Sequence, residues 1–315
     1  MPVITRADVR AATERVAGHL RRTPVLQLGP TSWLKCEFLQ HTGSFKARGA
    51  FNRQLAAAER GELDPAVGVV AASGGNAGLA HAFAARSIGV PATVFVPGST
   101  PAVKVDRLHA YGADVRLGGS EYADAHAAAV EFAEQRGALF CHAYDQLEVA
   151  AGAGGLAEEV LADVPDVDTL VVAVGGGGLL AGVLAAVGGR VRVVAVEPRS
   201  APTLAAALDA GRPVDVEVGG VAKDSLGARR IGSICFDVAT RTPGLVSLLV
   251  SDADIVAARA QLWSDTRIVS EHGAATAYAA LTSGGYLPAA GERVVTVVCG
   301  ANTDPASLAP APAEG

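Results

Sequence analysis

Several kinds of residue and segment are scarce in this 315-residue sequence, and each scarcity excludes a class of protein. Aromatic residues make up 5%, the net charge is −6 and no basic run is interleaved with aromatics, so we expect no nucleic-acid partner. No apolar stretch is long enough to span a bilayer, and the N-terminus lacks the cationic start and apolar core of a signal peptide. We therefore expect no membrane association and a cytoplasmic location.

Cysteine is also rare, and its spacing excludes two kinds of site. The four cysteines are scattered, with no CxxC pair and no histidine at ligand spacing; they are Cys36, Cys141, Cys235 and Cys299. The sequence thus predicts no metal site and no disulfide framework. Reduced thiols are typical of the cytoplasm.

Only four lysines are present, and one of them occupies an unusual position. Lys46 lies in the run TGSFKARGA (42–50), where apolar residues at helical spacing predict a helix with Ser44 as its cap. A lysine in a first helical turn, partly buried beside Phe45, is expected to have a lowered pKa and a larger share of free amine. A free amine can form an imine with an aldehyde. A surface lysine whose stem covers the helix is an equally good interpretation of this motif alone.

The rest of the chain predicts an α/β fold. Half of the residues are apolar, which is enough for a large core in one unit or two closely packed domains. Short β-branched runs alternate with alanine-rich helical stretches, as expected for mainly parallel sheets; the runs are 67–72, 92–96, 114–117, 170–174, 191–196, 245–250 and 293–298. Ligands of such folds bind at the carboxyl ends of strands. Three strand ends carry unusual loops, at residues 73–76, 175–178 and 299–302.

Four consecutive glycines follow the run at 170–174 and precede an apolar helix: Gly175, Gly176, Gly177 and Gly178. Successive N–H groups that point into one concavity at a helix start can bind a phosphate. The segment also fits a permissive dinucleotide fingerprint, with Glu197 at a suitable distance for a ribose hydroxyl. Taken alone, it does not separate a dinucleotide from a smaller phosphorylated cofactor.

The other two strand-end loops leave their interpretation open. Residues 73–76, SGGN, offer N–H groups, a hydroxyl and an amide at a helix start, which suits a carboxylate but also a simple capping turn. Cys299 ends the last strand, where a thiol is usually a small hydrophobe. Glu271 begins an apolar helix, and acids are common there because of the helix dipole.

Together, these segments resemble the pyridoxal-phosphate enzymes of fold type II, most closely the serine/threonine dehydratase group. The resemblance rests on four motifs in the family's order along nearly the whole chain: TGSFKARGA (42–50), SGGN (73–76), VGGGGL (174–179) and VCGAN (298–302). It implies two parallel-sheet α/β domains with the cofactor in the cleft between them. The implied large, cofactor-binding domain comprises residues 1–57 and 146–315, and the implied small domain, residues 58–145, carries the asparagine loop.

The resemblance also implies roles for individual residues. Lys46 would be the catalytic residue, holding the cofactor as a Schiff base and then taking the α-proton of the substrate. The implied cofactor-binding residues are Phe45, Lys46, Asn76, Gly175, Gly176, Gly177, Gly178 and Cys299. The implied substrate-binding residues are Ser73, Gly74, Gly75 and Asn76. Cys299 would face the pyridine nitrogen, and a neutral thiol there weakens the ring as an electron sink, which favours prompt elimination.

The implied reaction is β-elimination from L-serine, L-threonine or a related β-hydroxy amino acid, giving a 2-oxo acid and ammonia in amino-acid metabolism. Two alternatives remain: β- or γ-replacement, as in cysteine or threonine synthases, and a non-catalytic amino-acid-binding relative. The resemblance further implies a homodimer, and the end of the chain suggests no regulatory module and a loose tail from Pro305.

The chain departs from the family's pattern in ways that affect these expectations. Gly74 stands where serine racemases have a serine, so racemase activity is not expected, and Ala77 replaces a common histidine. Thr203 falls where a divalent-metal site would have an aspartate, so no divalent ion is expected, although a monovalent ion near Glu197 stays open. The sequence leaves the preferred substrate undetermined.

Overall fold

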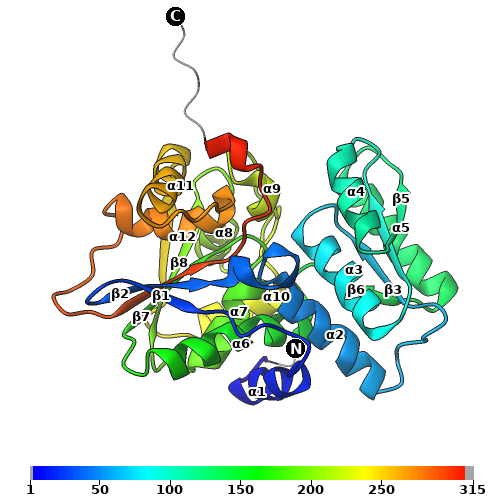
Figure 1. Ribbon diagram of the computed structural model, residues 1–315, viewed down its shortest axis with the longest axis horizontal. Coiled ribbons are helices and arrows are strands. Elements are labelled where there is room, and N and C mark those ends of the chain that lie inside the picture. Colours follow the sequence, from blue (N-terminus) through cyan, green and yellow to red (C-terminus); the bar gives the residue numbers. More distant parts are fainter. Residues whose placement is uncertain (1–2, 309–315) are drawn as a thin grey trace, which may run out of the picture.

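The computed structural model describes residues 3–308, which form two α/β bodies, each built on its own sheet (Figure 1). The strands are β1 (Val25–Gly29), β2 (Ser32–Cys36), β3 (Val69–Ala72), β4 (Ala92–Val96), β5 (Asp114–Leu117), β6 (Leu139–Cys141), β7 (Thr169–Ala173), β8 (Arg192–Pro198), β9 (Val246–Val250) and β10 (Val294–Val298). The α-helices are α1 (Arg6–Arg15), α2 (Lys46–Glu59), α3 (Asn76–Ile88), α4 (Ala102–Ala110), α5 (Tyr122–Arg136), α6 (Leu147–Asp163), α7 (Gly178–Val187), α8 (Thr203–Ala210), α9 (Lys223–Leu226), α10 (Ser233–Thr240), α11 (Asp252–Thr266) and α12 (His272–Thr282).

The larger body, called here the six-stranded body, has strand order β1-β2-β10-β7-β8-β9, parallel except for the β1–β2 pair. Helix α12 packs on β7, β8 and β10, while α7, backed by α6 and α1, lies on the other side of the sheet in Figure 1. Because helices cover both faces, β7 and β10 are buried along their whole lengths. This explains why both strands consist almost entirely of apolar residues.

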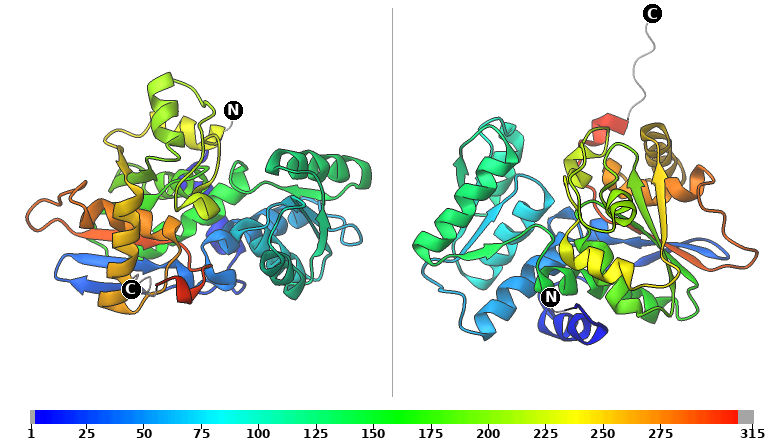
Figure 2. Two further views of the ribbon diagram at one scale, coloured as in Figure 1. Left: turned by 90° about the horizontal axis from the view of Figure 1, so that it is seen from above. Right: turned by 180° about the vertical axis from the view of Figure 1, so that it is seen from behind.

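The smaller, four-stranded body has strand order β5-β4-β3-β6, all parallel, and its strands fall between residues 69 and 141. Side chains alternate between the faces of a strand, and β3 follows this rule. Val69 and Ala71 pack with Leu79 of α3 and Leu108 of α4, whereas Val70 and Ala72 belong to the cluster under α5. Figure 2 shows this body standing beside the larger one, with its own helices around its sheet.

Helix α2 runs between the two bodies and packs against both, on α6 and on α3 (Figure 1). Its close approach to α6 requires glycine: a Cβ on Gly49 would lie 2.6 Å from the carbonyl oxygen of Val149, and one on Gly152 would lie 2.5 Å from that of Arg48. The start of α2, where Lys46 lies, is therefore held firmly against the six-stranded body.

The mainly parallel α/β fold predicted from the sequence is confirmed, and the strands at 92–96 and 114–117 were predicted to the residue. Strands β1, β2 and β6 were not predicted. Residues Pro305–Leu308 form a short 3-10 helix, and the rest of the expected tail lies outside the described residues. Within residues 3–308, no helix combines the length and apolarity needed to cross a bilayer.

Candidate active site

Lys46 is the first residue of α2, and its side chain is half-buried between the two bodies. Its Nζ donates a hydrogen bond to the carbonyl oxygen of Ala143 (2.7 Å) and lies 5.1 Å from the centre of the Phe45 ring. Burial lowers the pKa of the Lys46 ammonium to about 8, against the opposing influence of Cys299 and Glu271. At pH 7 roughly a tenth of such a group is neutral amine, compared with well under a thousandth of an ordinary lysine.

The expectation that Ser44 caps this helix was wrong. Ser44 has an extended backbone (φ −160°, ψ 160°) that forms a β-bridge with Gly300, and Phe45 is the residue that precedes the helix. The Ser44 hydroxyl is buried without a hydrogen-bond partner in the described residues. The bridge reaches Gly300, which adjoins Cys299, so it brings the segment before Lys46 to the carboxyl end of β10.

The four-glycine loop lies beside the lysine. Gly178 and Leu179 line the same small cavity as Lys46, Phe45 and Ala143. Gly177 has a left-handed backbone (φ 90°), which favours glycine. A Cβ on Gly176 would collide with the ring of Tyr144, and one on Gly178 would lie 2.8 Å from the carbonyl oxygen of Tyr144. The loop at the start of α7 therefore requires glycine, because the Tyr144 segment packs directly against it.

Cys299 is directly behind the start of α2. Its carbonyl oxygen accepts a hydrogen bond from the N–H of Phe45 (3.0 Å), and its side chain is buried. Burial strongly raises the pKa of the Cys299 thiol, and the nearby Glu271 adds to this effect. At neutral pH the group is a neutral thiol facing the same region as Lys46.

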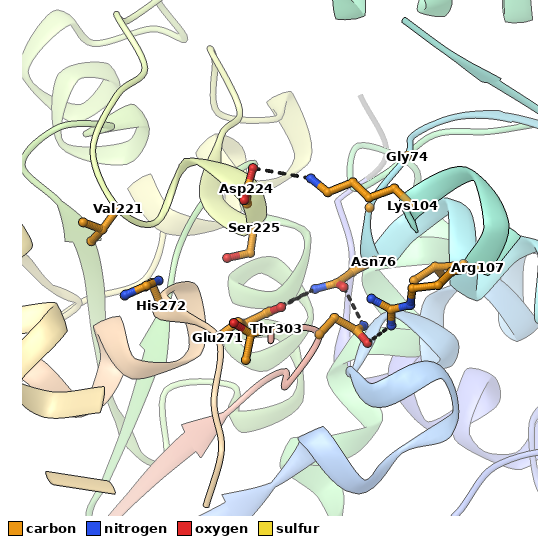
Figure 3. A pocket seen from close by; sticks show the side chains of 13 residues that line it. Gly74, Asn76, Lys104, Arg107, Val221, Asp224, Ser225, Glu271, His272 and Thr303 are labelled. Carbon is orange, nitrogen blue, oxygen red and sulfur yellow. Dashed lines mark hydrogen bonds and ion pairs between the residues drawn. The ribbon is translucent and has the colours of Figure 1, made fainter. Parts of the chain in front are cut away.

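The SGGN loop belongs to the four-stranded body and faces the six-stranded body across a cleft. Gly75 precedes α3, and its N–H donates to the Ser73 hydroxyl (3.3 Å). Helix α3 has no side-chain cap, so the N–H groups of its first turn are available at the cleft. The cleft is lined from both bodies, by Gly74, Gly75, Asn76, Leu79, Lys104, Arg107, Val221, Asp224, Ser225, Glu271, His272, Asn302 and Thr303 (Figure 3).

Several of these cleft residues were not identified from the sequence. Glu271 was taken as a helix-start acid, but its carboxylate makes no cap and instead accepts two hydrogen bonds from Asn76 Nδ2, at 2.9 and 3.1 Å (Figure 3). Burial raises the pKa of Glu271. Lys104 and Arg107 lie three residues apart on α4, and a pair at that spacing shares one helix face. That spacing is the one sequence signal that could have identified them.

Glu197 has a structural role. Its side chain is fully buried at the end of β8 and accepts hydrogen bonds from the Thr203 hydroxyl (3.0 Å) and from the N–H groups of Leu204 (2.7 Å) and Ala205 (2.9 Å). Burial raises the pKa of Glu197 to about 7, against these hydrogen bonds. A ribose hydroxyl cannot reach a carboxylate so enclosed. No group of three or more His, Cys, Asp or Glu in residues 3–308 is arranged to hold a metal ion.

Comparison with known proteins identifies the family to which this chain belongs. Residues 16–300 match the family model described as pyridoxal-phosphate dependent enzyme. The L-threonine ammonia-lyase of Geobacter sulfurreducens is 36% identical over 94% of this chain and 75% of its own length. Among solved structures, serine racemase from Dictyostelium discoideum has a TM-score of 0.87 at 30% identity, covering 96% of this chain and 99% of its own. The T.th. threonine deaminase has a TM-score of 0.85 at 32% identity, covering 95% and 99%. The chain belongs to the pyridoxal-phosphate-dependent enzymes, and its fold is fold type II.

The residues of the site fit this cofactor. Lys46 supplies a primary amine with a lowered pKa, which can link to the cofactor's aldehyde. Residues 175–178 are packed so closely by Tyr144 and Cys235 that the loop leaves no room for side chains, and it leads into the start of α7, which attracts a phosphate. Cys299 offers a buried neutral thiol near the lysine, as a partner for the pyridine nitrogen. These groups come from the carboxyl ends of β7 and β10 and from the start of α2, which converge on one region.

Proposed function

We propose that this chain is a lyase that converts a β-hydroxy amino acid, such as L-serine or L-threonine, to a 2-oxo acid and ammonia. The observation that carries the proposal is the position of Lys46. Its amine is half-buried, has a pKa lowered to about 8, and shares a cavity with Gly178 of the glycine loop. The names of the similar enzymes, L-threonine ammonia-lyase and threonine deaminase, support this class of reaction.

Bound pyridoxal phosphate supplies an aldehyde for covalent attachment and a ring that withdraws electrons from the substrate's Cα–H bond. In the proposed mechanism Lys46 holds the cofactor and, once released, removes the α-proton. Its lowered pKa favours the neutral amine needed for both tasks. Water leaves the β-carbon and water is later taken up to release ammonia, so the net products are the 2-oxo acid and ammonia.

The other site residues have positioning roles in this proposal. The N–H groups of residues 175–178 would hold the phosphate at the start of α7. Phe45, whose ring centre is 5.1 Å from Lys46 Nζ, would pack beside the cofactor ring. Ser73, Gly74, Gly75 and the start of α3 bind the substrate carboxylate. Because burial keeps the Cys299 thiol neutral, it would not hold a pyridine nitrogen protonated, which would favour elimination.

Three further features complete the proposal. We assign residues 1–57 and 146–315 to the large domain and 58–145 to the small domain, because each of these parts contains one complete sheet. A homodimer in the cytoplasm is the assembly and location we propose for it. Gly74 provides no hydroxyl on the cleft, so we do not propose racemisation, although serine racemase is a structural neighbour.

The test combines spectroscopy with a substrate panel. Protein purified with cofactor should be yellow, and Lys46→Ala should lose the visible band and at least a thousandfold of the oxo-acid release. Serine, threonine and other β-hydroxy amino acids would then be ranked by kcat/KM. A yellow wild type that releases oxo acid from none of them would reject the lyase proposal, as would release of a substituted amino acid only when sulfide is added.

The pH dependence of cofactor capture tests the role of Lys46 separately. Because neutral amine accumulates as pH rises through about 8, we expect the rate at which apoenzyme binds the cofactor covalently to rise about tenfold from pH 7 to pH 9. A rate that keeps rising steeply beyond pH 10 would indicate an ordinary, exposed lysine.

A further inference from the structure

Four side chains that line the cleft form a chain of hydrogen bonds that links the two bodies. Arg107 of α4 donates to Asn302 Oδ1, Asn302 Nδ2 donates to Asn76 Oδ1 (2.7 Å), and Asn76 Nδ2 donates to Glu271. Arg107 and Asn76 belong to the four-stranded body, whereas Asn302 and Glu271 belong to the six-stranded body. The chain therefore crosses between the bodies at each step.

The direction of this chain is fixed at one end by a backbone group. Asn302 Nδ2 also donates to the carbonyl oxygen of Thr42 (2.7 Å). A carbonyl oxygen only accepts and a guanidinium only donates, so Asn302 must turn its NH2 group to Thr42 and its oxygen to Arg107. With Asn302 held in this way, Asn76 must turn its own oxygen to Asn302 and its NH2 group to the Glu271 carboxylate, which lines the cleft.

The backbone around Thr42 is built to present that carbonyl. Thr42 is one of two non-glycine residues with positive φ (62°) among residues 3–308, a conformation that is unfavourable for a residue with a β-branched side chain. The next residue, Gly43, has a φ of 75°, and a Cβ on it would lie 2.9 Å from Asn302 Oδ1. The strained turn just before Lys46 thus makes room for Asn302 and supplies its acceptor.

We propose that Asn302 is a positioning residue: together with Glu271 it orients the carboxamide of Asn76, the residue that the resemblance assigns to the 3-hydroxyl oxygen of the cofactor, so that the NH2 group of Asn76 can donate to that oxygen. The inference rests on the cofactor assignment, which the yellow colour of the wild type tests independently. An Asn76 turned the other way would place its carbonyl oxygen against the cofactor oxygen, acceptor against acceptor. The sequence carries Asn302 within the VCGAN motif, but only the structure connects it to Asn76.

The discriminating variant is Asn302→Asp, which keeps the size of the side chain and the contact with Arg107 but removes both N–H donors. The new carboxylate would repel Asn76 Oδ1, and turning the amide over would place that oxygen against the Glu271 carboxylate, so Asn76 would have no orientation that satisfies both neighbours. We expect the dissociation constant for pyridoxal phosphate to rise at least tenfold and the visible absorption band to shift. Asn302→Ala leaves Asn76 free to keep its orientation and should weaken binding only about threefold.

This order, aspartate worse than alanine, distinguishes orientation from packing, because simple loss of packing would make alanine the more damaging change. In an Asn76→Ala background, neither substitution at 302 should weaken cofactor binding further. If Asn302→Asp fails to fold, Asn302→Ala can be used in its place: it should weaken cofactor binding in the wild-type background and cause no further loss in the Asn76→Ala background.

A matched control is present in α2. Asn52 is buried, donates through Nδ2 to the carbonyl oxygen of Glu148 (2.7 Å) and accepts from Arg15 (2.7 Å), the same pair of partner types as Asn302. Asn52→Asp should lower the melting temperature yet leave the absorption band and the cofactor dissociation constant within twofold of the wild type. The proposal is overturned if Asn302→Asp binds cofactor like the wild type, if alanine is the worse substitution, or if the effects at 302 persist without Asn76.

Discussion

The two bodies differ in how much of each is buried. In the six-stranded body, β7, β10 and every residue of α7 are buried. In the four-stranded body, β5 is largely exposed and Leu108 is the only buried residue of α4. Local stability follows buried apolar contact, so we expect the smaller body to open more readily than the larger one.

The site residues divide along the same line. Lys46, the glycine loop and Cys299, which we assign to the cofactor, are anchored on the six-stranded body or on the end of α2 packed against it. Gly74 and Gly75, which we assign to the substrate carboxylate, belong to the four-stranded body, as do the cleft residues Lys104 and Arg107. Tight packing thus holds the cofactor side in place, whereas the substrate side belongs to the body that we expect to adjust.

The largest expected effect concerns the attachment of α2 to the six-stranded body. Arg48, two residues after Lys46, is buried and pairs with Glu37 and Glu159, both at 2.8 Å. Arg48→Met would leave the fully buried Glu37 without a cation, and we expect a loss of about 3–5 kcal/mol in the free energy of unfolding. Urea unfolding followed by circular dichroism measures it.

Arg60→Met is the control for this experiment, because Arg60 ends the same helix and also forms two 2.8 Å ion pairs, but its side chain is 43% exposed. We expect a loss below about 1 kcal/mol. Equal losses of unfolding free energy in Arg48→Met and Arg60→Met would show that the buried ion pairs of Arg48 do not anchor the helix.

A second pair of variants compares a buried strand of the six-stranded body with the exposed edge strand of the four-stranded body. Leu170, in the central strand β7, is fully buried, whereas Leu117, in β5, is 56% exposed. We expect Leu170→Ala to cost about 2–5 kcal/mol, through lost burial and a residual cavity, and Leu117→Ala to cost less than about 1 kcal/mol. Similar values from urea titrations of the two proteins would mean that the bodies do not differ in stability as their burial implies.

Sequence patterns predicted those parts of the fold where burial and residue type agree. The strand at 92–96 is apolar and bounded by Pro91 and Pro97, and the sequence predicted its limits. Strand β2 was missed because Lys35 makes it look polar. In the structure that lysine is fully buried and neutralised by Glu159, 124 residues away in sequence (2.5 Å). No local pattern reveals such a partner.

The same reason limits what could be predicted of the site. Lys46 stood out because lysine is rare in this chain, and the glycine loop because four glycines are consecutive. The structure places Lys46 and Gly178 of that loop on one cavity. Glu271 and Asn302 act through Asn76, which is 195 and 226 residues away in sequence. Ser44 was wrongly predicted to be a cap because a serine before a helix usually caps it, whereas the bridge to Gly300 keeps this one extended.

A smaller effect concerns Glu197, buried in the six-stranded body. Burial raises its pKa in the folded protein from 4.5 to about 7, so the folded state holds a proton that the unfolded state releases over this range. The contribution of Glu197 to stability is therefore fully present below pH 4.5 and is lost as pH rises through 7. Relative to Glu197→Gln, the wild type should lose up to about 3 kcal/mol between pH 4.5 and pH 8.

Urea titrations of both proteins at several pH values measure this difference. A difference that stays constant from pH 4.5 to pH 8 would mean that Glu197 titrates normally in the folded protein. The described part of the four-stranded body has no fully buried acid, but burial lowers the pKa of His81 to about 3 and that of His142 to about 4. Its stability should therefore change in the opposite sense, falling as pH drops below 6.5.

The smallest expected effect concerns the ion pair that joins the bodies across the cleft. Lys104 of α4 and Asp224 of α9 are 3.4 Å apart, and their side chains are 36% and 78% exposed (Figure 3). Water and salt screen such a pair, and holding two mobile side chains together costs entropy, so Asp224→Asn should change the free energy of unfolding by less than about 0.5 kcal/mol. The pair can also help the smaller body to approach the larger one, and in that case Asp224→Asn should raise KM about twofold at low salt. In 0.5 M NaCl the Debye length is only a few ångströms, so the KM values of the variant and the wild type should become equal. A change in unfolding energy as large as that of Arg48→Met would contradict the comparison, because it would mean that the two bodies are locked together by the cleft.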